Sequence, residues 1–144
     1  MSVILLINGP NLNLLGEREP EVYGTDTLAD CVGDARVAAE TAGHALEDFQ
    51  SNHEGELIEA IQGARGRAAA VVINPGAFTH TSYAIADALA AYDGVKVELH
   101  LSNTSAREEW RRTSVVGPVV TGTVAGFGRT GYRLAVEAAI ASMS

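Results

Sequence analysis

The chain has 144 residues, of which 47% are hydrophobic and 19% are charged, and its formal net charge is −8. This composition is typical of a globular protein with one buried core, and the negative charge argues against nucleic acid or an anionic membrane as the main partner. Nine of the ten basic residues are arginines, whose planar guanidinium groups pair with carboxylates through two parallel hydrogen bonds. A small anionic substrate therefore suits this chain better than a polyanion.

The cysteine content and the apolar runs predict where the protein resides. Cys31 is the single cysteine, which excludes a disulfide framework within the chain and favours a reducing compartment. The apolar start at residues 3–7 is too short for the hydrophobic region of a signal peptide and has no basic stretch before it. No run approaches the ~20 apolar residues that span a bilayer. We therefore expect a soluble, cytoplasmic protein.

Short apolar runs alternate along the chain with longer amphipathic segments, which predicts a parallel β-sheet covered by helices on both faces. The expected strands are residues 3–7, 45–50, 69–73, 95–101 and 119–125. The expected helices are 28–42, 54–64, 82–92, 107–112 and 131–142, the first with Thr27 as its N-cap and Gly43 at its end. We predict an α/β fold in three layers, a flavodoxin-like doubly wound sheet with strand order 2-1-3-4-5, as one domain over residues 1–144.

The connection at residues 9–26 is much longer than the roughly 2–6 residues typical of a loop between a strand and a helix. It shows no convincing secondary structure, yet it is too apolar for simple disorder because it includes Leu12, Leu14, Leu15, Val22 and Tyr23. Long loops in compact domains are often functional. We therefore predict that residues 17–26 form a lid over an active site.

Polar side chains collect just after three of the predicted strands. They are Asn8, Asn11, Asn13, Arg18 and Tyr23 after the first, Asn74, Thr79, His80, Thr81 and Ser82 after the third, and Glu98, His100, Ser102, Asn103 and Arg107 around the end of the fourth. Open parallel sheets bind ligands at the carboxyl ends of their strands. The three groups are therefore expected to converge on one crevice.

Tyr23 is a candidate base, although an unperturbed tyrosine with a pKa of about 10 is a poor one at neutral pH. A pKa near 7 requires roughly 4 kcal/mol of preference for the tyrosinate, which a nearby guanidinium can supply. Arg18 lies five residues away in the same loop. The alternative is that the Tyr23 ring packs in the loop while Arg18 pairs with one of the neighbouring glutamates.

Other motifs are interpreted as structural. No HExxH or CxxC pattern is present, so we expect no metal site, and Cys31 is expected to fill the core. The segment 126–131 (GFGRTG) matches a dinucleotide fingerprint, but only thirteen residues follow it. That remainder is too short for the second strand and the acidic residue that the motif requires. These glycines are therefore predicted to serve tight turns and close packing.

The chain strongly resembles the type II 3-dehydroquinate dehydratases over nearly its whole length. The matching segments, in the family's order, are NGPNLNLLG at 8–16, REP at 18–20, YG at 23–24, QSN at 50–52, EG at 54–55, NPGA at 74–77, THTS at 79–82, ELHLSN at 98–103, RE at 107–108 and GFG at 126–128. The resemblance implies a lyase that converts 3-dehydroquinate to 3-dehydroshikimate, without a cofactor, in the shikimate pathway of aromatic amino-acid biosynthesis. The same reaction in quinate catabolism is the alternative.

The resemblance also implies catalytic roles. Tyr23 abstracts the proton next to the substrate ketone, and Arg18 holds this tyrosine as tyrosinate and stabilises the transition state. Asn11 orients the enolate, and His100, positioned by Glu98, is the general acid for the departing hydroxyl. An acid and a base on opposite sides of the ring are what this elimination requires.

The substrate-binding residues that the resemblance implies are Asn74, His80, Leu101, Ser102 and Arg111, with backbone N–H groups at 101 and 102. Asp87 is expected to reach a neighbouring subunit's site, in trimers that assemble into a dodecamer. Departures from the family pattern are Ser105, where histidine is frequent, Trp110, where phenylalanine is common, and Gly117, where serine usually precedes Pro118.

One alternative mechanism and two alternative functions are considered. The route through a lysine Schiff base is disfavoured, because Lys96 is the only lysine and lies at the start of a predicted strand. A flavodoxin-like nucleotide or flavin binder and a catalytically inactive scaffold remain alternatives from other functional classes.

Overall fold

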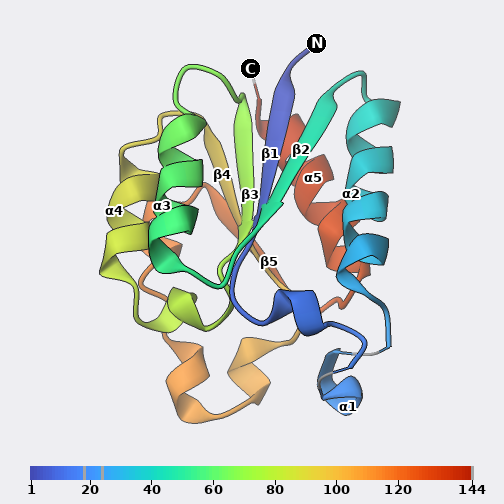
Figure 1. Cartoon of the computed structure of the whole chain (residues 1–144), viewed down its shortest axis with the longest axis vertical. Helices are drawn as coiled ribbons and strands as arrows, with labels where there is room; N and C mark the ends of the chain where they lie inside the picture. The colour runs from blue at the N-terminus through green and yellow to red at the C-terminus, as the bar shows by residue number, and fades with distance from the viewer. Residues whose placement is uncertain (18, 24, 144) are drawn as a thin grey trace.

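The computed structural model describes residues 1–17, 19–23 and 25–143, and at 22 and 23 it describes the backbone alone. Five parallel strands form one sheet in the order β2-β1-β3-β4-β5 (Figure 1). The strands are β1 (Val3–Asn8), β2 (Ala45–Gln50), β3 (Ala70–Asn74), β4 (Val95–His100) and β5 (Gly122–Ala125). The predicted α/β class and strand order are confirmed.

Four longer helices cover the two faces of the sheet (Figure 1). Helices α2 (Leu28–Thr41) and α5 (Thr130–Ser142) pack on one face, and α3 (Glu54–Gly63) and α4 (Tyr83–Ala90) pack on the other. The three predicted layers are therefore present. Within the described residues, no helix combines the length and the apolar character needed to cross a membrane.

The buried core consists of two clusters, one on each face of the sheet. In β1, Ile4 and Leu6 contact the cluster beneath α2 and α5, whereas Leu5 and Ile7 contact the one beneath α3 and α4. Successive side chains of a strand point to opposite faces, so a strand with helices on both sides must be apolar at consecutive positions. This is why apolar and polar side chains do not alternate in the first apolar run, residues 3–7.

Helix α2 begins and ends where the sequence predicts. Thr27 Oγ1 accepts a hydrogen bond from the Asp30 backbone N–H at 3.2 Å, and Asp30 Oδ2 accepts one from the Thr27 N–H at 3.0 Å. This capping box satisfies backbone donors that the first helical turn leaves free. The helix ends before Gly43, whose φ of +84° is a conformation that glycine adopts without strain.

Several local elements differ from the sequence-based prediction. The long connection contains the 3₁₀ helix η1 (Leu12–Leu14) and the short helix α1 (Pro20–Tyr23). In place of the predicted helix 107–112 the chain forms the 3₁₀ helix η4 (Glu109–Arg112), and a second 3₁₀ helix, η3 (Thr104–Ala106), precedes it. The last strand begins at Gly122 rather than at 119, because Pro118 lies in the 3₁₀ helix η5 (Gly117–Val119) and proline cannot donate to a sheet ladder.

A buried hydrogen-bond network joins α5 to the carboxyl ends of β1 and β3. The hydroxyl of Tyr132 donates to Asn8 Oδ1 at 2.6 Å and accepts from Asn74 Nδ2 at 3.2 Å. All three side chains are almost fully buried. Burial raises the pKa of Tyr132 well above its ordinary value, so this tyrosine stays a neutral hydrogen-bonding group.

We expect Tyr132→Phe to destabilise the protein by about 1–3 kcal/mol, because the buried amide groups of Asn8 and Asn74 lose a partner that water cannot replace. The midpoint of urea unfolding measures this effect. Tyr83→Phe is the matched control, since Tyr83 is 73% exposed and should unfold at the wild-type midpoint. Equal midpoints for both variants would contradict the structural role of the Tyr132 hydroxyl.

Candidate active site

A cavity of about 70 Å³ lies at the carboxyl ends of β1, β3 and β4. Its polar lining comes from the three strand ends that the sequence predicts to converge, and also from the segment between β4 and β5. The predicted site residues that line it are Asn11, Asn74, His80, His100, Leu101, Ser102 and Arg111. Thr104 and Arg107 also contribute. The predicted crevice is therefore present.

The approach of the chain after β1 to the end of β3 depends on a glycine. Gly9 N–H donates to Asn74 O at 2.8 Å, and a Cβ atom at Gly9 would lie 2.6 Å from the Pro75 carbonyl oxygen. Only a residue without a side chain fits at this distance. The close crossing directs the chain into the η1 segment, so that Asn11 reaches the cavity.

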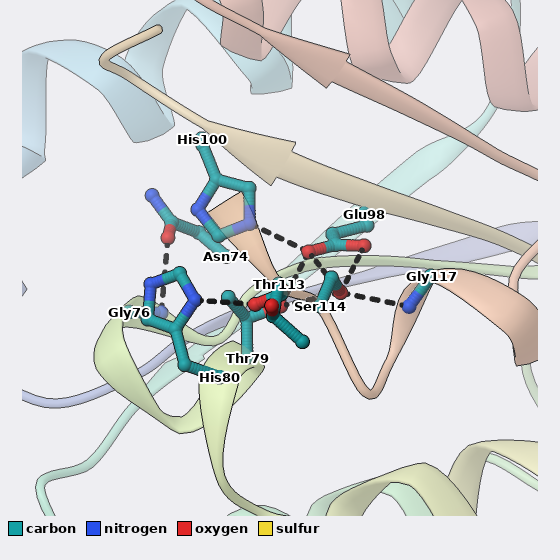
Figure 2. A network of polar contacts seen from close by, with 9 residues as sticks. All are labelled: Asn74, Gly76, Thr79, His80, Glu98, His100, Thr113, Ser114 and Gly117. Atoms are coloured by element: carbon teal, nitrogen blue, oxygen red, sulfur yellow. Dashed lines mark hydrogen bonds and ion pairs between the residues drawn. The ribbon is translucent and has the colours of Figure 1, made fainter. Parts of the chain in front are cut away.

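Glu98 and His100 form a buried hydrogen-bonded pair on β4. They are two residues apart and so lie on the same face of the strand, and their exposed fractions are 1% and 7%. His100 Nε2 lies 2.6 Å from Glu98 Oε2 (Figure 2). His100 lines the cavity, whereas Glu98 lies behind it and has no surface there. The arrangement presents an imidazole to a ligand and hides the carboxylate that orients it.

Two hydroxyl groups surround the same carboxylate. Thr79, from the 3₁₀ helix η2 (Gly76–His80), donates to Glu98 Oε2, and Ser114 Oγ lies 3.1 and 3.2 Å from the two carboxylate oxygens. Burial by itself raises the pKa of Glu98, but hydrogen bonds from His100, Thr79 and Ser114 outweigh burial, and the pKa lies below its ordinary value. Glu98 is therefore ionised at neutral pH.

His80 and Arg111 meet at Trp110, one of the positions that departs from the family pattern. His80 Nδ1 lies 2.6 Å from the Thr113 carbonyl oxygen, which can only accept, so Nδ1 carries a proton. The Trp110 ring packs edge-on to His80 at 5.2 Å, and Arg111 Cζ lies 4.0 Å from the centre of that ring. Trp110 thus supports two lining residues without lining the cavity.

Two guanidinium groups give the cavity local positive charge in an otherwise acidic chain. The side chains of Arg107 and Arg111 are only 13% and 14% exposed. Arg111 Nε pairs with Glu108 Oε2 at 2.9 Å, and Arg107 contacts Glu19 at 3.6 Å. Both arginines line the cavity, and a guanidinium group suits the binding of a carboxylate.

The predicted lid is described only in part. Arg18 lies outside the described residues, and of Tyr23 only the backbone is described, at the end of α1. In Figure 1, α1 and the segment that follows β4 both lie at the carboxyl end of the sheet, at the bottom of the view. The predicted pairing of Arg18 with Tyr23 thus lies beyond the described side chains.

The far end of the predicted lid is tied to the helices on one face of the sheet. Arg129 contacts Asp34 of α2 at 2.6 and 3.0 Å and Asp26 at 3.1 Å. Arg129 follows Gly126 and Gly128, whose φ values of +97° and +58° favour glycine. The segment 126–131 therefore serves a tight turn and a clamp, in agreement with the prediction that its glycines are structural.

Four further residues complete the comparison between the sequence-based predictions and the structure. Asp87 is exposed on α4 and does not line the cavity of its own chain. Lys96 Nζ donates to Leu89 O at the start of β4, away from the cavity. Ser114 was missed by sequence reasoning, because it lies in the irregular segment between β4 and β5 and follows no strand directly. Cys31 is buried, as predicted for a core residue, and burial raises its pKa to about 12.

Comparison with known proteins identifies similar chains. The family model "Dehydroquinase class II" matches residues 2–140. A catabolic 3-dehydroquinase of Aspergillus clavatus is 56% identical over 134 residues, covering 93% of this chain and 89% of the relative. The 3-dehydroquinate dehydratase 2 of Agrobacterium fabrum is 53% identical over 137 residues, covering 95% and 93%. The crystal structure of a type II dehydroquinase from Butyrivibrio crossotus matches with a TM-score of 0.93 and 44% identity, covering 96% and 97%.

The lowered pKa of Glu98 predicts a component of stability that acid removes. A carboxyl group whose pKa is lower in the folded than in the unfolded state stabilises the fold above its ordinary value, 4.5, and this contribution is lost as the pH falls through the folded value. We expect the unfolding free energy of wild type to fall more steeply with acidification than that of Glu98→Gln. Urea unfolding at a series of pH values measures both slopes. Parallel slopes would show that Glu98 is not held in its ionised form by the fold.

Proposed function

The chain belongs to the class II dehydroquinase family, and on this premise we propose that it converts 3-dehydroquinate to 3-dehydroshikimate by elimination of water through an enolate. The observation that carries the proposal is the buried Glu98–His100 pair beside a cavity with two arginines. In the reaction a C–H bond next to the ketone breaks first, and the enolate then expels the β-hydroxyl group as water. Such a reaction needs a base, a group that binds the enolate oxygen, and an acid.

Tyr23 is the proposed base, and Arg18 is the proposed group that keeps it anionic. A guanidinium close to a phenol favours the charged form of the phenol, which an unassisted tyrosine does not reach at neutral pH. Residues 17–26 are proposed to close over the substrate as a lid, so that water is excluded when the proton is removed. The motif match at 18–24 supports this role.

His100 is the proposed general acid, and Glu98 orients it. Because Glu98 holds Nε2, the edge of the ring that bears Nδ1 is free to deliver a proton to the leaving hydroxyl group. Asn11, which lines the cavity close to the end of β1, is proposed to orient the enolate oxygen through its amide. These two residues come from the carboxyl ends of different strands, β1 and β4, which suits an acid and an enolate-binding group that act on different parts of one ring.

Binding of the substrate's carboxylate and hydroxyl groups is proposed to involve Asn74, His80, Leu101, Ser102 and Arg111. The pairing of β4 with β5 ends at His100, so the N–H groups of Leu101 and Ser102 lie past the ladder, where they suit an anionic oxygen. Arg111 is positioned by Trp110 and Glu108. This cluster of donors supports a carboxylate-bearing substrate.

The proposed assembly is a dodecamer built from trimers, in which Asp87 completes the site of a neighbouring subunit. Its exposed position on α4, away from the cavity of its own chain, supports this role. We further propose a single domain over residues 1–144, a cytoplasmic location that suits the free Cys31, and a reaction that needs no cofactor.

Purified protein mixed with 3-dehydroquinate is expected to show a rise in ultraviolet absorbance, because the product is a conjugated enone. Tyr23→Phe should lower kcat by at least about 10²-fold, the low end of what a general base contributes, while the oligomer measured by light scattering stays intact. No absorbance change with wild type would overturn the proposed reaction. Full activity in Tyr23→Phe would remove Tyr23 from the role of base.

The pathway is a separate question, because aromatic amino-acid biosynthesis and quinate catabolism use the same reaction. The sequence resemblance favours the shikimate pathway. The relative from Aspergillus clavatus is named catabolic, which supports quinate breakdown as a second candidate. The flavodoxin-like nucleotide binder receives no support from the family match, which spans residues 2–140.

Deletion of the gene in its own organism distinguishes the two roles. If the enzyme serves biosynthesis, the deletion strain should require aromatic amino acids, and a plasmid copy of wild type but not of Tyr23→Phe should restore growth without them. A strain that grows normally on minimal medium but not on quinate as the sole carbon source would replace the biosynthetic role by the catabolic one.

A further inference from the structure

The carboxylate of Glu98 receives hydrogen bonds from three separate parts of the chain. His100 lies two residues further along β4, Thr79 comes from η2, and Ser114 comes from the segment between η4 and η5 (Figure 2). None of the three donors is a sequence neighbour of another. The tertiary structure has therefore built this cage around one side chain.

The hydroxyl groups have few choices of acceptor. Ser114 Oγ accepts the Gly117 N–H at 2.8 Å, and its single proton has acceptors at the two Glu98 oxygens, 3.1 and 3.2 Å away, and at Thr79 Oγ1, 3.1 Å away. Thr79 directs its hydroxyl at Glu98 Oε2, while its backbone oxygen accepts the Val115 N–H at 2.8 Å. An ionised carboxylate is acceptor only. Two hydroxyl donors therefore favour ionised Glu98, and its third partner, His100 Nε2, must carry a proton.

Loss of the two hydroxyl groups would exchange donor and acceptor in the hydrogen bond between Glu98 and His100. A buried carboxylate without donors gains a proton more readily, because burial favours the neutral form. A protonated Glu98 would donate to His100 Nε2, and the imidazole would then be held neutral. A neutral imidazole is a far weaker acid than an imidazolium, so the ring could no longer protonate a leaving hydroxyl group efficiently.

We propose that Thr79 and Ser114 are positioning residues of this enzyme, which hold Glu98 as an oriented anion so that His100 keeps a proton on Nε2 in addition to the proton on Nδ1, which it delivers as general acid to the leaving hydroxyl group. Neither hydroxyl group lines the cavity, so both act through Glu98 and not on the substrate. The catalytic part of this inference rests on the proposed dehydration. The part that concerns the proton on His100 Nε2 is independent of it.

The matched control is a variant that breaks a second hydroxyl–carboxylate hydrogen bond, elsewhere in the fold. Ser82 is buried, its Oγ donates to Glu54 Oε2, and it caps α4 by accepting from the Ile85 N–H. Ser82→Ala thus removes a buried hydroxyl bonded to a glutamate, with a comparable loss of stability, but leaves Glu98 untouched. It should keep the wild-type kcat and the wild-type signals of His100.

The test uses Thr79→Val, Ser114→Ala, the double variant and the conservative Thr79→Ser, each checked for folding by its urea midpoint. We expect kcat to fall roughly 10-fold in each single variant and roughly 100-fold in the double variant, within the range that a general acid contributes. KM should change less than about twofold, because the substrate contacts are untouched, and the conservative variant should restore most of the rate.

The second readout is the ¹⁵N spectrum of the His100 ring, which reports the protonated nitrogen without substrate. Wild type, Thr79→Ser and Ser82→Ala should show Nε2 protonated, and the double variant should show Nε2 as an acceptor. Unchanged kcat in Thr79→Val and Ser114→Ala, or a lowered kcat with Nε2 still protonated in the double variant, would overturn the proposal. If wild type shows no turnover, the proposed function fails, and the ring spectrum alone still decides the role of the two hydroxyl groups.

Discussion

The site depends on one physical constraint, the cost of keeping the Glu98 carboxylate ionised where only 1% of the residue reaches solvent. Removing such a charge from water costs several kcal/mol unless donors replace the lost hydration. Here the donors come from β4, from η2 and from the segment before η5. The same bonds that stabilise the charge therefore draw three distant segments to one edge of the sheet, and His100 is oriented as a consequence.

A second buried network, on the opposite face of the sheet, supports the other side of the cavity. Tyr132 joins Asn8 and Asn74 beneath α5, and the Oδ1 atom of Asn74 accepts the Gly76 N–H at 3.2 Å. Because most side chains of both networks are buried, side chains at the cavity base have few alternative rotamers. Rigid support of this kind keeps an acid and its binding partners at fixed distances.

The positive charge at the cavity contrasts with the negative charge of the whole chain. The chain carries a net charge of −8, yet Arg107 and Arg111 converge on the cavity with most of their side chains buried. Their acidic partners, Glu19 and Glu108, lie on the solvent side and are about half exposed. An anionic substrate thus meets locally positive donors, although the molecule as a whole repels anions.

The sequence by itself determined the fold class, the strand order and most elements, because buried parallel strands require consecutive apolar residues and helices require their caps and ends, as at Thr27 and Gly43. It also predicted that Asn11, Asn74, His80 and His100 share one crevice, since they follow neighbouring strands. Only the tertiary structure decided how Ser114 and Trp110 take part. They lie in the irregular segment between β4 and β5, whose path follows long-range contacts to Glu98 and His80 and not any local periodicity.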